Sequence, residues 1–227
     1  MSCSVCSGTV FARKTVLWRA LIDEWQLCEA EAAYIDRQQG ETCQSCGANL
    51  RSMALANAFL SAIGAQGALL LDVAKDSKYK ALKILEINEA GSLTPVLKQF
   101  NGHVFGAYPQ LDMHALPFSD AHFDVLIHSD TLEHVVNPVH ALGECRRVLK
   151  GGGALCFTVP IIVGRVSRDR SGLPASFHGQ SEVAQSDMLV QTEFGVDAWT
   201  YVMRAGFANV SIHSVEYPAA LAFCARK

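Results

Sequence analysis

The sequence predicts an α/β fold built on a mainly parallel sheet, with a small N-terminal extension in front of it. From about residue 81 onward, short apolar segments alternate with helical segments, a pattern typical of a parallel sheet covered on both faces. Residues 1–50 differ in texture, because they hold two Cys-x-x-Cys pairs and two of the three tryptophans. The 227 residues, half of them hydrophobic, suffice for one full domain with an appendage.

The segments before the first strand are expected to be helical. The run "EAEAAYIDRQQG" reads as a short polar helix that ends at Gly40. Residues 52–71 carry no charge, yet they contain Asn57 and Gly64, so they predict a buried helix that ends at a glycine turn rather than a membrane span. We therefore expect an extension over 1–50, a helical connection over 51–80 and a main domain over 81–227.

Four short apolar runs predict the parallel strands, which are "LKILEI" (82–87), "HVFGAY" (103–108), "FDVLIHS" (123–129) and "ALCFTVP" (154–160). Between the first two, "GSLTPVLKQF" begins a helix. Asn137 and Pro138 provide an N-cap and a first-turn proline for a helix that runs to Leu149 and is stopped by residues 150–153.

The C-terminal segment predicts one helix and a reversed hairpin. "GVDAWTYVMRAGF" reads as the helix, and Pro218 separates two β-rich segments, "NVSIHSVEY" and "AALAFCARK". This spacing fits an antiparallel pair that closes a parallel sheet.

Two cysteine pairs predict a metal site in the extension. Cys3 with Cys6 and Cys43 with Cys46 each place two thiolates on one side of a tight turn, and two such turns complete a tetrahedral zinc site. Four protein ligands leave no open position, so this zinc is expected to be structural. Unbound thiols or a redox pair are the alternatives. The other four cysteines are expected in apolar surroundings.

Charge and composition favour a small-molecule partner. The formal net charge is −3 and no run of Lys or Arg stands out, which excludes the electrostatic signature of nucleic-acid binding. The start "MSCSVCSGTVFARK" lacks the apolar core of a signal peptide, so we expect a cytoplasmic protein with no membrane partner. Its oligomeric state does not follow from the sequence.

Four stretches together resemble a known family of enzymes. They are "ILEINEAGSL", "LDMHALPFSDAHFDVLIHSDTLEHV", "ALGECRRVLKGGGALCFTVP" and "AGFANV", in that order. Over residues 81–225 the chain is similar to the class I S-adenosylmethionine-dependent methyltransferases, most closely the small-molecule group called type 11. The resemblance implies a doubly wound, Rossmann-like, mostly parallel sheet of seven strands that binds S-adenosylmethionine at the strand ends.

The family pattern also implies which residues bind the cofactor. Glu86 and Gly91 would frame the first loop, where free backbone N–H groups could receive the methionine carboxylate. Asp112 would accept a hydrogen bond from the adenine amino group and Met113 would pack on the adenine ring. The other implied positions are Tyr108 at the end of the second strand and His128 with Ser129, which would flank the methionine part of the cofactor.

Two positions depart from the family pattern. The first loop has one glycine where the family usually has two or three, so Asn88 and Ala90 bring side chains toward the cofactor. The second strand usually ends in an acid that holds the ribose hydroxyls, but residues 106–108 are Gly, Ala and Tyr. Glu89 is a candidate substitute for that acid.

The expected activity is methyl transfer to an oxygen or nitrogen of a small metabolite, such as a sugar or a secondary metabolite. His178 is the candidate general base, because it lies beside Gly179 in a connection that commonly covers the substrate pocket in this fold. Arg165, Arg168 and Arg170 either bind an acidic group on the acceptor or form a solvated face. The alternative is a non-catalytic, zinc-containing binding or scaffold protein on a degenerate methyltransferase fold.

Overall fold

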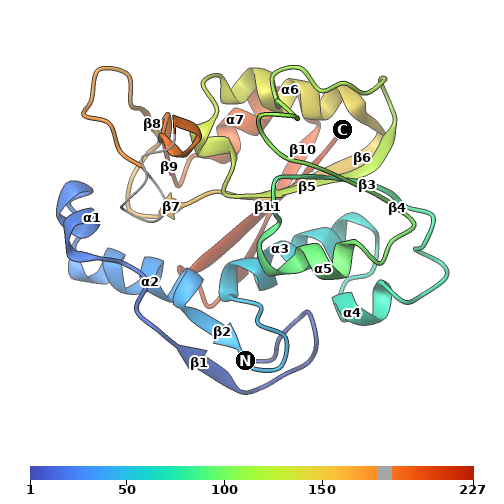
Figure 1. The fold of residues 1–227 in the computed structure, drawn as a ribbon, viewed down its shortest axis with the longest axis horizontal. Helices are drawn as coiled ribbons and strands as arrows, with labels where there is room; N and C mark the ends of the chain where they lie inside the picture. The colour runs from blue at the N-terminus through green and yellow to red at the C-terminus, as the bar shows by residue number, and fades with distance from the viewer. Residues whose placement is uncertain (178–185) are drawn as a thin grey trace.

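The centre of the protein is a six-stranded sheet with helices on both faces (Figure 1). The computed structural model describes residues 1–177 and 186–227. The strand order is β10-β11-β6-β5-β3-β4. These strands are β3 (Lys83–Ile87), β4 (Gly102–Gly106), β5 (Phe123–Ser129), β6 (Leu149–Thr158), β10 (Asn209–Val215) and β11 (Ala220–Arg226). The expected α/β class is therefore confirmed.

The sheet is mixed rather than purely parallel. Strands β4, β3, β5 and β6 run parallel, β11 pairs antiparallel with β6, and β10 pairs antiparallel with β11. The closing hairpin is thus as expected, but seven strands were wrong, since the described residues place six in this sheet. The segment after β4 forms turns, and it buries Leu111, Met113 and Leu116 in the apolar layer beside the sheet.

Two apolar layers sandwich the sheet, as the alternation in β5 shows. Val125 and Ile127 face one buried cluster, whereas Leu126 faces the other, because successive side chains of a strand point to opposite faces. The helices of the first layer are α3 (Leu50–Ala62), α4 (Leu70–Val73) and α5 (Thr94–Leu97), and those of the second are α6 (Pro138–Val148) and α7 (Trp199–Arg204) (Figure 1).

Helix α3 is the uncharged buried helix expected from the sequence. Asn49 caps its N-terminus by accepting a hydrogen bond from the Ser52 N–H at 2.8 Å, and Gly64 follows its end with a φ of +70°. A left-handed backbone of this kind is the usual glycine stop signal of a helix. The helix packs against β11, β6 and β10, so it anchors the N-terminal part of the chain to the sheet.

The N-terminal extension forms a small unit of its own secondary structure. It contains β1 (Phe11–Arg13), α1 (Arg19–Glu24), α2 (Glu29–Gly40) and β2 (Glu41–Cys43), and β1 pairs antiparallel with β2. Helix α2 has the bounds expected from its sequence. Gly40 is required there, because a Cβ would lie 2.1 Å from the Lys14 carbonyl oxygen.

A second small sheet joins the extension to the rest of the chain. Its strands are β7 (Ile161–Ile162), β9 (Thr192–Gly195) and β8 (Arg168–Asp169), in that order. Arg165, just after β7, binds both carboxylate oxygens of Glu31 at 2.7 and 3.1 Å and donates to the carbonyls of Trp25 and Gln26, each at 2.8 Å. The Arg165 guanidinium holds the pKa of the Glu31 carboxyl below its usual value.

The other two arginines of this region also have partners within the chain. Arg168 and Arg170 both pair with the buried carboxylate of Glu193, and Arg170 lies over the ring of Trp25. All three arginines therefore hold segments of the fold together rather than forming a free cationic surface. Within the described residues, none of the helices has the length and hydropathy needed to cross a membrane.

Candidate functional site

The two cysteine pairs meet at one point in the extension. The four Sγ atoms of Cys3, Cys6, Cys43 and Cys46 lie within 4.8 Å of one another. The Sγ atoms of Cys3 and Cys46 are 3.6 Å apart, and those of Cys6 and Cys43 are 3.7 Å apart. A tetrahedron of sulfurs at about 2.3 Å from a zinc ion has edges of about 3.8 Å, so the donor set fits tetrahedral zinc.

Each cysteine pair lies in a tight backbone turn, and the two turns have the same conformation. The Ser7 N–H donates to the Cys3 carbonyl and the Gly47 N–H to the Cys43 carbonyl, each at 2.8 Å. Ser7 and Gly47 also share a left-handed backbone, with φ of +65° and +76°. The sequence thus builds one turn twice, once at each cysteine pair, and each copy presents two sulfurs to the same centre.

The thiols of the cluster differ in their pKa values. Burial raises the pKa of Cys43, but hydrogen bonds from the backbone N–H groups of Cys46 and Ser45 and from the Cys6 and Cys46 side chains lower it to about 7. Burial raises the pKa of the Cys3 and Cys46 thiols above its usual value. Elsewhere, Cys145, Cys156 and Cys224 are buried as expected. Cys28 is not: it is exposed, because it forms the N-cap of α2 at the surface.

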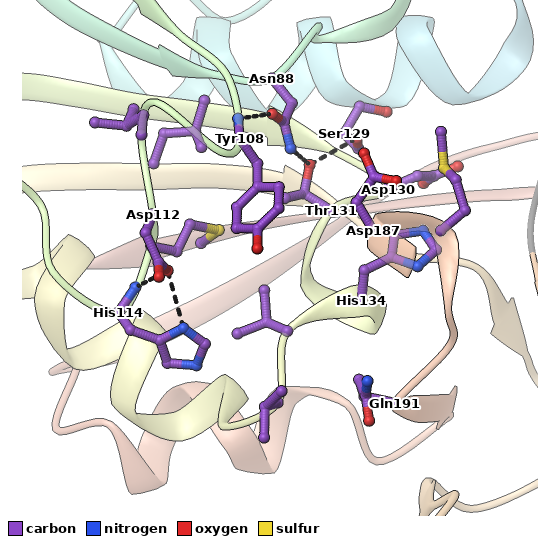
Figure 2. Close-up of a pocket in the computed structure, with 16 residues that line it drawn as sticks. Asn88, Tyr108, Asp112, His114, Ser129, Asp130, Thr131, His134, Asp187 and Gln191 are labelled. Carbon is purple, nitrogen blue, oxygen red and sulfur yellow. Dashed lines mark hydrogen bonds and ion pairs between the residues drawn. The ribbon is translucent and has the colours of Figure 1, made fainter. Parts of the chain in front are cut away.

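A candidate binding site lies at the carboxyl ends of β3, β4 and β5, where the chain encloses a cavity of about 430 Å³ (Figure 2). The chain goes from β3 to β4 on one side and then crosses to β5 on the other, so the strand order reverses here. Ligands of open α/β sheets bind at such a switch point. Of the residues expected to bind the cofactor, Tyr108, Asp112, Met113 and Ser129 line this cavity.

Glu86 does not line the cavity, but it stabilises the loop after β3 that forms one of its walls. Its side chain is fully buried and accepts hydrogen bonds from the Ala90 N–H at 2.8 Å, the Thr94 hydroxyl at 2.5 Å and His103 Nε2 at 2.7 Å. The carboxylate therefore holds the loop after β3 against β4. Thr94 and His103, which sequence reasoning missed, complete this buried network.

Gly91 lies at the start of a 3₁₀ turn, η1 (Gly91–Leu93), which leads into the short helix α5. Its φ is +58°, and a Cβ would lie 2.8 Å from the hydroxyl of Ser52 on α3. The Ser92 N–H donates to the same hydroxyl at 3.4 Å. The backbone N–H groups of Ala90 and Ser92 in the first loop thus donate hydrogen bonds to protein side chains.

His128 is buried in the apolar layer and does not line the cavity. Its ring stacks on Phe157 with centroids 5.1 Å apart, and within the described residues neither ring nitrogen has a hydrogen-bond partner. Burial lowers the pKa of His128 to about 4, so the ring is neutral at neutral pH. It supports the strand tip rather than contacting a ligand in the cavity.

Asn88 is a cavity residue whose role the sequence did not show. It occupies the left-handed region with φ of +55°, a conformation that Asn tolerates better than most residues with a side chain. Its carboxamide oxygen accepts from the Tyr108 N–H at 3.0 Å and its nitrogen donates to the Thr131 hydroxyl at 3.2 Å (Figure 2). Asn88 thus joins the ends of all three strands.

Asp130 and Arg51 form an ion pair at the edge of the cavity. Asp130 lines the cavity, follows β5 with φ of +45°, and accepts from the Thr158 hydroxyl at 3.1 Å. Arg51 comes from the first turn of α3, and burial lowers its pKa to about 10, so it stays charged at neutral pH. The sequence did not indicate this ion pair, because the pairing of Arg51 with Asp130 depends on tertiary structure.

Asp112 presents its carboxylate at the opposite side of the cavity (Figure 2). It accepts from the backbone N–H of His114 at 2.8 Å and lies 2.9 Å from His114 Nδ1. The backbone N–H of His114 is the main cause that keeps the Asp112 pKa below its usual value. Asp112 is therefore an ionised acceptor at neutral pH.

The other polar residues near the loop ends differ in whether they line the cavity. His134, in the turn η2 (Leu132–His134), lines the cavity and lies 3.1 Å from the Leu189 carbonyl through Nδ1. Asp187, in η3 (Ser186–Met188), lines the far side. Glu89 is exposed and is not among the lining residues, and His178 lies outside the described residues.

One comparison with known proteins matches a family. Residues 62–157, which are under half of the chain, match the family model described as a methyltransferase domain. This span holds the first three parallel strands, most of β6, and most of the cavity residues. The match supports the expected S-adenosylmethionine-dependent methyltransferase family.

A curated relative covers a smaller part of the chain. It is the uncharacterized 37.1 kDa protein in transposon TN4556 of Streptomyces fradiae, 43% identical over 49 residues. The matched segment makes up 22% of this chain and only 14% of that protein's length.

Solved structures resemble the fold at low identity. A methyltransferase from Mesorhizobium loti is 13% identical with a TM-score of 0.45, over 70% of this chain and 95% of that one. One from Thermotoga maritima is 18% identical with a TM-score of 0.40, over 70% and 89%. The trans-methyltransferase CalH in complex with SAH is 14% identical with a TM-score of 0.42, over 90% and 60%. Scores this low say nothing about the activity of this chain.

Proposed function

We propose that the cavity at the ends of β3, β4 and β5 binds S-adenosylmethionine and that the chain transfers its methyl group to a small metabolite. The acceptor atom is an oxygen or a nitrogen, with sugars and secondary metabolites as the first candidates. The observation that carries this proposal is the cavity itself, which lies at the point where the strand order reverses and is lined by Asp112, Asn88 and Asp130.

The size and the polar groups of the cavity support this choice of ligand. A volume of about 430 Å³ lies within the usual range for small-molecule sites. The Asp112 carboxylate can accept a hydrogen bond from the adenine amino group, and Met113 provides an apolar surface beside it. Among the described residues, the lining includes three aspartates but neither Lys nor Arg, which suits a cofactor that carries a sulfonium and an ammonium group.

The chemistry needs positioning more than activation. The bound cofactor supplies an electrophilic methyl group, so much of the rate can come from holding an acceptor in line with it. In this chain Asn88 and Glu86 fix the loop after β3, and the Arg51–Asp130 pair fixes the loop after β5. A base is needed only for an acceptor that must lose a proton.

Replacing Asp112 with alanine is expected to weaken cofactor binding by roughly ten- to a hundred-fold. The loss of one hydrogen bond between a neutral amino group and a carboxylate costs about 1.5–3 kcal/mol. Isothermal titration with S-adenosylmethionine or its demethylated product measures the dissociation constant. The same titration on the wild type separates this proposal from the non-catalytic scaffold alternative, because a scaffold would release no heat of binding.

The matched control is Asp76→Ala. Asp76 accepts from the backbone N–H two residues ahead at 2.9 Å, just as Asp112 does, but it is exposed and does not line the cavity. This variant should bind the cofactor like the wild type. Equal dissociation constants for both variants would show that the adenine does not contact Asp112.

His178 is the proposed general base for an acceptor that must be deprotonated. The proposal rests on its sequence position alone. With a known acceptor, His178→Ala should lower turnover by about 10²–10⁴-fold and leave cofactor binding intact, as expected for the loss of a base. Turnover within about twofold of the wild type at saturating substrate would remove His178 from this role.

We further propose that Cys3, Cys6, Cys43 and Cys46 hold one structural zinc ion. The sulfur spacing and the paired turns support this, and four protein ligands complete the coordination without a free position. Such an ion stabilises the extension and takes no part in methyl transfer. A cytoplasmic location remains a prediction from the sequence.

A further inference from the structure

We propose that the four-cysteine site holds the cofactor loop in place through the first turn of α3, so that metal binding and cofactor binding strengthen each other. The inference rests on the proposed cofactor function of the cavity. It assigns Arg51 and Ser52 as positioning residues, which act on the cofactor through the loops that they contact.

The second cysteine turn passes directly into helix α3. The Cys43 N–H donates to the Ala48 carbonyl at 2.9 Å, and Thr42 forms a β-bridge with Asn49. Asn49 is the N-cap of α3 and accepts from the Ser52 N–H at 2.8 Å. Only two residues separate Cys46 from this cap, so the cysteine turn sets where the helix begins.

The first cysteine turn binds the same helix from another side. The Ser4 hydroxyl donates to the Met53 carbonyl at 3.1 Å, and the Ser4 carbonyl accepts from the Leu70 N–H at 3.1 Å. Cys3 and Cys43 belong to the same buried cluster as Met53. A metal that joins the two turns therefore clamps the start of α3 from both.

The first turn of α3 in turn contacts two loops of the cavity. The buried Ser52 hydroxyl accepts from the Ser92 N–H at 3.4 Å in the loop after β3. Arg51 pairs with Asp130 in the loop after β5, and Asp130 lines the cavity. Adjacent residues thus reach the two loops between which the cofactor is proposed to bind.

A physical coupling follows from this chain of contacts. Without metal, the two cysteine turns lose their common centre, because metal binding at such sites is linked to folding. The cap and first turn of α3 would then fray, and both loops would lose their support. A ligand that binds only to the ordered loops then has a higher affinity for the metal-bound protein. By linkage, the bound ligand raises the affinity for the metal by the same factor.

The experiment is a titration of the full-length chain with S-adenosylhomocysteine, with and without zinc. Circular dichroism tests whether the chelator-treated protein keeps its fold. We expect the dissociation constant to rise by about 5- to 100-fold when zinc is removed. Reciprocally, saturating S-adenosylhomocysteine should raise the zinc affinity by the same factor, measured by competition with a chromophoric chelator.

Two variants separate positioning from a general loss of structure. Arg51→Gln and Ser52→Ala should keep one zinc per chain, bind S-adenosylhomocysteine more weakly, and show a reduced response of zinc affinity to this ligand. The matched control is Ser61→Ala, near the other end of the same helix, which should behave like the wild type.

Each outcome decides the matter. Equal affinity for S-adenosylhomocysteine in zinc-loaded and zinc-free folded protein overturns the coupling but leaves the cofactor site standing. If zinc removal unfolds the whole chain, the zinc-loaded Arg51→Gln and Ser52→Ala variants provide the test. The proposal is overturned if both bind S-adenosylhomocysteine with the affinity of the wild type. No binding to zinc-loaded wild type overturns the cofactor function and the coupling together.

Discussion

Replacing Glu86 with alanine is expected to lower the free energy of unfolding by about 3–5 kcal/mol, the usual cost of removing one partner from a buried charged network. The substitution leaves three buried partners without their acceptor, namely the Ala90 N–H, the Thr94 hydroxyl and His103 Nε2. Denaturant unfolding monitored by circular dichroism measures the change.

Two further variants give this prediction its controls. Glu86→Gln keeps a carbonyl acceptor and should cost less than Glu86→Ala, because fewer of the buried donors are then left unpaired. Glu89→Ala removes an exposed carboxylate three residues away and should leave the midpoint nearly unchanged. If the alanine variants of Glu86 and Glu89 unfold alike, the buried network does not stabilise the loop.

Replacing Cys43 with serine is expected to abolish stable metal binding and to loosen the N-terminal extension. Structural zinc sites in small peptides bind with about 10–16 kcal/mol, and much of this is folding free energy, so one lost thiolate has a large effect. Elemental analysis should find about one zinc per chain in the wild type and far less in the variant. Limited proteolysis of the variant should then cut within the extension.

Cys28→Ser is the matched control for this experiment. Cys28 lies in the same extension but is exposed and outside the four-sulfur cluster. It should retain the zinc content and protease resistance of the wild type. Freshly purified wild type without zinc, never exposed to a chelator, would rule out the metal site.

Local patterns in the sequence were enough to predict most of the sheet and the cysteine cluster. Strands β3 and β5 are short, mainly apolar runs and α6 carries its own cap, so their signals lie within a few residues. The cysteine pairs likewise carry their geometry in their spacing. The closing hairpin was predicted because Pro218 separates two strand-like segments.

The edge of the sheet was harder to predict because tertiary burial decided it. The sequence predicted a strand that ends at residue 108, but β4 ends at Gly106, and the apolar residues Leu111 and Met113 that follow pack into the layer under α6. A turn bond from the Ala115 N–H to the Asp112 carbonyl curves this segment away from an extended form. Such competition between sheet and layer is not visible in local periodicity.

The support of the cavity was missed for a related reason. Arg51 and Asp130 lie far apart in the sequence, and neither position carries a local motif. His128 followed the family pattern into the site, yet its side chain points into the apolar layer, because alternate residues of β5 face opposite sides. The sequence indicated that the Asn88 side chain lies near the cofactor, because this loop has one glycine where the family pattern usually has two or three, but it did not show which groups Asn88 binds.

The contacts of Arg165 carry a consequence for the order of events during synthesis. The Tyr34 hydroxyl, the Glu31 carboxylate and the Trp25 indole bind Val163, Arg165 and Ser176, which are 129 to 151 residues later. At about 5–20 residues per second, a ribosome needs roughly 6 to 30 seconds to make that stretch.

During this interval the cysteine turns can close, since they need the chain only as far as Ala48. The apolar side chains of the α1 and α2 region cannot yet be buried, because Leu21, Trp25 and Ile35 pack against Ile162 and Val190. The nascent extension therefore exposes an apolar surface until the chain beyond β6 emerges. Its exposure makes this interval the one in which the growing chain most needs protection from aggregation.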